Sequence, residues 1–83
     1  MMFIFTKKAE KTLQKLPIQV QNLIIATLRK IKNGEIKGRF RTLINLLPAT
    51  HRLRIWDYRL ILQKEGNSYF ILDLWHRQSI YKD

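Results

Sequence analysis

The chain has 83 residues, of which 46% are hydrophobic and 11% aromatic, so it can bury enough apolar surface for a single small domain over residues 1–83. It contains no cysteine, which excludes disulfides and thiolate metal sites, and its two histidines are far apart in sequence, so we expect neither a metal nor a cofactor. Sixteen basic residues against six acidic ones give a net charge of +10, which indicates an anionic partner such as nucleic acid, an acidic protein or a membrane surface.

The N-terminal part of the chain predicts a strand followed by two helices. Residues 2–5 are apolar and rich in β-forming residues, which favours a first strand. Thr6 can cap a helix that runs to about Lys15. Pro17 suits the first turn of a second helix, and Asn33-Gly34 supplies its stop. The apolar residues of this second helix recur at helical spacing: Val20, Leu23, Ile24, Leu28 and Ile31.

The C-terminal part predicts three consecutive antiparallel strands. Residues 35–48 read as a basic, irregular connection whose apolar residues 43–47 we expect to pack on the helices. Residues 51–55, 58–64 and 69–75 then read as strands, joined by tight turns at Trp56-Asp57 and Gly66-Asn67. The order β-α-α-β-β-β predicts an α+β fold in which two N-terminal helices pack on one face of an antiparallel sheet.

Basic residues are spaced along these strands. Residues 51–83 hold four of the seven arginines, together with both histidines. Because a strand fixes side-chain directions with a period of two, cations spaced along neighbouring strands can converge on one surface. A guanidinium is planar and always charged, and it matches the geometry of phosphate. The pattern therefore indicates a phosphate-binding surface.

Two stretches resemble the signatures of a known family. Residues 51–59, HRLRIWDYR, resemble the Y-R-L-R-x-G-D-Y-R stretch of the RelE/ParE superfamily of bacterial toxins, and residues 73–81, DLWHRQSIY, resemble its closing G-H-R-x-x-x-Y stretch. Together with the order of elements, the resemblance covers essentially the whole chain and implies a RelE-like fold. Three positions depart from the family pattern, because Trp56 and Trp75 replace glycines and His51 replaces a tyrosine. Members that cut RNA often have lysines where Arg52 or Arg54 stand here.

The resemblance to RelE-like members implies a ribosome-dependent endoribonuclease that cuts messenger RNA without a metal, by attack of a 2′-hydroxyl on the adjacent phosphate. The resemblance places Arg54, Arg59 and Arg77 at the phosphate. Proton transfer is left to Tyr81 or His76, since a guanidinium with a pKa above about 12 is not an ordinary base. The expected RNA contacts are basic residues on the strands and the first helix: Arg52, His51, Lys7, Lys8 and Lys11.

The same resemblance leaves two other functions open. ParE-like members inhibit DNA gyrase and need no catalytic cluster, and a third possibility is a non-catalytic domain that binds RNA or an antitoxin. In each toxin reading the chain is the toxin of a type II toxin–antitoxin module. Its implied partners are a cognate RelB-like antitoxin with an acidic or amphipathic segment and, for the nuclease, the ribosome and mRNA. The apolar runs are too short to span a bilayer, and the absence of cysteine permits a cytosolic location. We therefore expect a cytoplasmic protein without a membrane partner.

Overall fold

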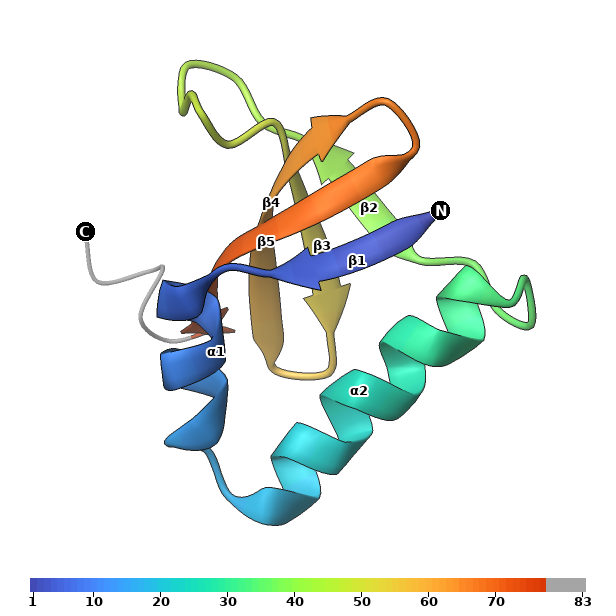
Figure 1. The fold of residues 1–83 in the computed structure, drawn as a ribbon, viewed down its shortest axis with the longest axis vertical. Coiled ribbons are helices and arrows are strands. Elements are labelled where there is room, and N and C mark those ends of the chain that lie inside the picture. The colour runs from blue at the N-terminus through green and yellow to red at the C-terminus, as the bar shows by residue number, and fades with distance from the viewer. Residues whose placement is uncertain (78–83) are drawn as a thin grey trace.

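Within residues 1–77, five strands form one mixed sheet in the order β1-β5-β4-β3-β2 (Figure 1). The computed structural model describes residues 1–77. The strands are β1 (Met2–Phe5), β2 (Arg39–Thr42), β3 (His51–Ile55), β4 (Tyr58–Glu65) and β5 (Ser68–His76). The three strands predicted for the C-terminal part are confirmed to within one residue at each end, and they pair antiparallel as expected.

Two features of the sheet correct the expectation from sequence. The connection over residues 35–48 contains β2, which pairs antiparallel with β3. The alternation Arg39-Phe40-Arg41, with Phe40 against the core, is the pattern of a half-buried strand. The second correction is that β1 pairs parallel with β5, so the sheet is mixed rather than wholly antiparallel. No tight turn joins these two strands, so local chain geometry does not impose antiparallel pairing.

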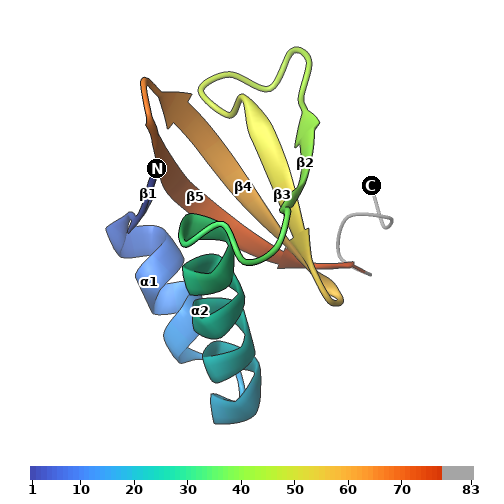
Figure 2. The same cartoon turned by 90° about the vertical axis from the view of Figure 1, so that its right-hand side faces the viewer.

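Both helices, α1 (Lys7–Gln14) and α2 (Ile18–Lys32), lie on the same side of the sheet (Figure 2). The expected cap at Thr6 is confirmed, because its Oγ1 accepts a hydrogen bond from the N–H of Ala9 at 3.2 Å. The same hydroxyl donates to the carbonyl of Ile71 at 2.8 Å and so ties the start of α1 to β5. Pro17 is the N-cap residue of α2, one position before the helix begins.

The core lies between the helices and the sheet. Its largest fully buried side chains are each under 2% exposed: Ile24, Leu53, Leu60, Leu62 and Ile71. Burying a side chain of this size stabilises the fold by about 1.5–3 kcal/mol. No helix within residues 1–77 is long and apolar enough to cross a membrane.

The loop between β2 and β3 does not pack on the helices, contrary to expectation. The N–H of Leu43 donates to the carbonyl of Thr50 at 2.9 Å, which extends the β2–β3 hairpin and directs the loop away from α1 and α2 (Figure 1). Ile44 and Leu47 are accordingly 79% and 84% exposed. The loop therefore lies at the end of the sheet opposite the helices.

Candidate nucleic-acid interface

The face of the sheet opposite the helices, called the open face below, carries rows of arginines. Arg39 on β2 is the register partner of Arg54 on β3, and Arg54 is in turn the partner of Arg59 on β4. A second row pairs Arg41 with Arg52. Residues directly opposite each other in an antiparallel pair have Cβ atoms about 4.5–5.5 Å apart. Antiparallel pairing therefore gathers cations from three strands.

These arginines line one cavity of about 270 Å³, called the arginine cavity below, and its lining is Arg39, Phe40, Arg41, Arg52, Arg54 and Arg59. None of these lining residues is acidic. Arg59 lies on the central strand and is only 4% exposed. Because attraction between charges is stronger where water is excluded, a buried guanidinium is well placed to attract an anion that enters the cavity.

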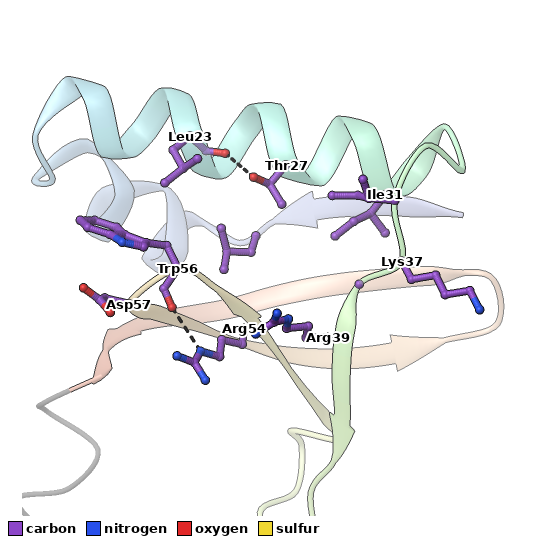
Figure 3. Close-up of a pocket in the computed structure, with 11 residues that line it drawn as sticks. Leu23, Thr27, Ile31, Lys37, Arg39, Arg54, Trp56 and Asp57 are labelled. Atoms are coloured by element: carbon purple, nitrogen blue, oxygen red, sulfur yellow. Dashed lines mark hydrogen bonds between the residues drawn. The ribbon is translucent and has the colours of Figure 1, made fainter.

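The β3–β4 turn fixes Arg54 beside this cavity. Its Nε donates to the carbonyl of Trp56 at 3.3 Å, and its side chain points away from α2 (Figure 3). Trp56 has φ +54°, a left-handed conformation that glycine adopts most readily. The turn thus keeps a glycine-type backbone although a tryptophan occupies the position.

Both histidines lie on the helix side of the sheet, away from the arginine cavity. His51 is the register partner of the core residue Leu62, and its ring lies edge-on to Tyr69 with centroids 5.8 Å apart. Its Nδ1 is 2.9 Å from the Oγ1 of Thr50. His76 is the partner of Tyr58, which packs against the core, and the two rings meet edge-on at 5.1 Å.

The remaining expected site residues are separate from the arginine cavity or beyond the described part of the chain. The N–H of Arg77 donates to the carbonyl of Asp57 at 2.7 Å, and its exposed side chain does not line the cavity. Tyr81 lies outside the described residues. Three of the expected arginines, Arg52, Arg54 and Arg59, are therefore the part of the predicted site that the structure brings together.

The expected lysines Lys7, Lys8 and Lys11 are exposed on α1. The Nζ of Lys8 lies 3.5 Å from the Oδ2 of Asp73 on β5. Burial of Asp73 by itself raises its pKa, but hydrogen bonds from the Trp75 indole and the Leu74 N–H, the charge of Lys8 and the Thr12 hydroxyl together outweigh burial. The pKa of Asp73 therefore lies below its ordinary value of 3.8. This carboxylate joins α1 to β5 in its charged form.

A larger cavity, of about 400 Å³, lies between α2 and the β3–β4 turn (Figure 3). Leu23, Ile31 and Ile36 give it an apolar wall, and Lys37 stands at its rim. Arg39 and Arg54 line this cavity as well as the arginine cavity. The two cavities therefore adjoin, with Arg39 and Arg54 between them.

Sequence reasoning missed two of the five arginines that converge, Arg39 and Arg41. Both lie in the stretch 35–48, for which the sequence predicts an irregular connection, and an irregular connection implies no side-chain direction. The signal that identifies them is local: the Arg-Phe-Arg alternation at 39–41 matches the Arg-Leu-Arg alternation at 52–54, which is paired with it.

Comparison with known proteins agrees with the fold described above. A family model described as the ParE toxin of type II toxin–antitoxin systems, parDE, matches residues 3–81. No curated protein matches the chain in sequence.

Two solved structures share the fold. The RelB–RelE antitoxin–toxin complex from Methanococcus jannaschii contains a chain with a TM-score of 0.72 and 21% identity, covering 94% of this chain and 94% of that one. The toxin–antitoxin complex RelBE2 from Mycobacterium tuberculosis gives 0.73 and 24%, covering 92% of this chain and 96% of that one. With the family model matching nearly the whole length, the chain belongs to the ParE toxin family of type II toxin–antitoxin systems, within the RelE/ParE superfamily.

Proposed function

We propose that this toxin cuts messenger RNA on the ribosome, with the arginine cavity as the site that holds the scissile phosphate. The observation that carries the proposal is the convergence of Arg39, Arg41, Arg52, Arg54 and Arg59 on one cavity, whose lining within residues 1–77 has no acidic residue. Attack by a 2′-hydroxyl puts additional negative charge on the phosphate oxygens in the transition state. Fixed guanidinium groups stabilise that charge without moving, and they need no metal to do so.

Within this proposal the arginines have different tasks. Arg59 is buried and central, so it acts on the developing charge, while the exposed Arg39, Arg41 and Arg54 bind and orient the flanking phosphates. Proton transfer needs another group, because a guanidinium is not an ordinary base. Since His76 packs on the helix side against Tyr58, we assign the proton transfer to Tyr81, which the closing motif supplies.

A second function, inhibition of DNA gyrase, is favoured by two observations. The matching family model is that of ParE, and among residues 1–77 the lining of the arginine cavity includes no histidine or carboxylate to move a proton. In this reading the arginines bind an acidic surface or DNA and no bond is broken.

One experiment distinguishes these functions. Purified toxin is added to cell-free translation of a defined mRNA, and primer extension maps any new 5′ ends, while plasmid supercoiling by gyrase is followed in parallel. Cleavage that needs ribosomes supports the nuclease, and blocked supercoiling with intact mRNA supports the gyrase inhibitor. If the mRNA stays intact and gyrase still supercoils the plasmid, the chain is a binding domain alone.

We also propose that a RelB-like antitoxin docks in the larger cavity between α2 and the β3–β4 turn. The neighbours in structure are toxin–antitoxin complexes, and a chain of charge +10 attracts an acidic partner. The apolar wall with a cationic rim suits an amphipathic acidic segment. Such a segment would pair with Arg39 and Arg54 and so remove two cations from the arginine cavity.

The docking site is tested by co-purification of the toxin with the product of the neighbouring gene. Leu23→Asp places a charge on the apolar wall and should release the antitoxin, while Ile18→Asp, exposed on the same helix outside this cavity, should not. Retention of the antitoxin by Leu23→Asp would place the docking surface elsewhere.

A further inference from the structure

The open face carries a second cavity beside the arginine cavity. It also measures about 270 Å³, and its lining is apolar except for one cation: Leu43, Leu46, Ala49, Arg52, Ile61 and Trp75. Arg52 lines both cavities. Register places two of these residues next to the arginines, since Ile61 is the partner of Arg52 and Trp75 is the partner of Arg59. A flexible ligand can therefore occupy the two cavities together.

The aromatic wall of this apolar cavity, Trp75, is held in place by a hydrogen bond to Asp73 on the same strand. The indole Nε1 of Trp75 donates to the Oδ2 of Asp73 at 2.9 Å. The other oxygen, Oδ1, accepts from the N–H of Leu74 at 2.9 Å and from the Oγ1 of Thr12 on α1 at 3.2 Å. Trp75 nevertheless remains 39% exposed. A ring that is fixed before binding loses little conformational entropy when a ligand stacks on it.

We propose that the apolar cavity binds a nucleobase of the same RNA strand whose phosphate occupies the arginine cavity, with the base stacked on Trp75. The proposal deepens the function above and depends on it, because the arginine cavity supplies the phosphate site next to it. A nucleotide carries a flat aromatic base one sugar away from its phosphate, which matches an apolar cavity with an aromatic wall adjoining a cationic one. An inorganic anion could occupy the arginine cavity, but it has no apolar or aromatic group that could occupy the apolar cavity.

Fluorescence of Trp75 reports this contact directly. Trp56→Phe leaves Trp75 as the sole tryptophan, since the chain has two. The probe is a short oligoadenylate with 2′-O-methyl riboses, which cannot be cut by 2′-hydroxyl attack, and the comparison strand has the same length and charge but is abasic. We expect the oligoadenylate to quench Trp75 and to bind about 5- to 150-fold more tightly than the abasic strand, the range for stacking of one base.

Two substitutions in the β2–β3 loop give a matched pair. Leu46→Gln places an amide in the apolar cavity and should abolish the preference for the strand with bases, while leaving abasic binding unchanged. Ile44→Gln, equally in the loop but 79% exposed and not part of the lining, should keep the preference. Because both positions are more than half exposed, neither change removes core packing.

The outcomes separate this proposal from the one on which it depends. Equal binding of both strands, with Trp75 unquenched, would show that the base subsite is wrong while the phosphate site stands. Binding of neither strand would overturn both. Quenching of Trp75 by an acidic peptide but not by the oligoadenylate would overturn the nucleobase assignment in favour of a protein ligand.

Discussion

Arg54 and Arg59 face each other directly across the β3–β4 pair, on the open face of the sheet. Like charges at directly opposed positions destabilise a sheet. Arg39 extends the same row on β2, so the repulsion involves three neighbouring strands. A phosphate bound in the arginine cavity, as proposed above, would reduce this repulsion and so stabilise the sheet.

Replacing Arg54 by Gln should therefore stabilise the free protein. We expect the free energy of unfolding to rise at low ionic strength by about 0.2–1 kcal/mol for each of the two cross-strand pairs, with Arg39 and with Arg59, that the substitution removes. Salt screens such repulsion over about 10 Å at 0.1 M, so the gain should shrink as salt is added. Urea unfolding at two salt concentrations measures both effects. Arg29→Gln is the control, because a cation in the last turn of α2 is favourable and its loss should slightly destabilise.

Removal of the buried cation should affect the rate of cleavage more than RNA binding. If the nuclease proposal holds, Arg59→Ala should lower the rate on programmed ribosomes by about a hundred- to a thousandfold, the typical cost of losing one transition-state donor. Arg77→Ala tests the role that the closing motif implies for that residue. Lys11→Ala, on the exposed side of α1, should instead alter affinity and its salt dependence.

Circular dichroism and antitoxin binding must first show that Arg59→Ala is folded, since the side chain is buried. Cleavage at the parental rate by a folded Arg59→Ala protein would contradict the assignment and favour gyrase inhibition or binding alone.

The β3–β4 turn offers a test of backbone strain. Trp56 has φ +54°, a conformation that costs a residue with a Cβ about 1–2 kcal/mol. Trp56→Gly removes that cost and so raises the free energy of unfolding. Two effects reduce this increase: glycine has more conformational freedom in the unfolded chain, and the ring contact with Tyr58 is lost. We expect a net stabilisation of up to about 1 kcal/mol in thermal or urea unfolding.

Asn45→Gly is the matched control for this turn, because Asn45 also has positive φ, at +61°, but asparagine tolerates the left-handed region. Its gain should be smaller than that of Trp56→Gly. A loss of stability in Trp56→Gly would mean that the ring contact with Tyr58 outweighs the strain.

Most of the fold could be predicted because its signals are local. The helical spacing of Ile24, Leu28 and Ile31 and the tight turns at Trp56-Asp57 and Gly66-Asn67 each depend on residues close in sequence. The pairing of β1 with β5 joins Met2 to Ser68 and has no local signal. The local signal for β2 is weak, because a four-residue strand in a basic stretch shows only one apolar residue, Phe40, of a period-two pattern.

The sequence predicts that the site is a cationic surface, but it does not predict which residues form it. The alternation around Leu53 placed Arg52 and Arg54 on one face, and register then added Arg59. The same alternation turns His51 toward Tyr69, which a list of basic residues does not reveal. The apolar cavity needs the loop, β4 and β5 together, so only the folded chain shows it.

The last prediction concerns acid sensitivity of the contact between α1 and β5. Because the pKa of Asp73 is held below its ordinary value, the charged carboxylate stabilises the folded state above about pH 4, and that stabilisation is lost as the pH falls below 3.8 through the lowered pKa. Asn at this position cannot ionise. At pH 7 we expect Asp73→Asn to lower the free energy of unfolding by about 1 kcal/mol, since hydrogen bonds to a charged acceptor are replaced by weaker ones. The difference between the two proteins should then narrow as unfolding is measured at decreasing pH.

The control variant is Lys8→Met. It should have a smaller effect than Asp73→Asn, because Lys8 contributes only a largely exposed ion pair. A difference between parent and Asp73→Asn that is the same at pH 7 and pH 3 would show that the carboxylate charge does not hold α1 to β5.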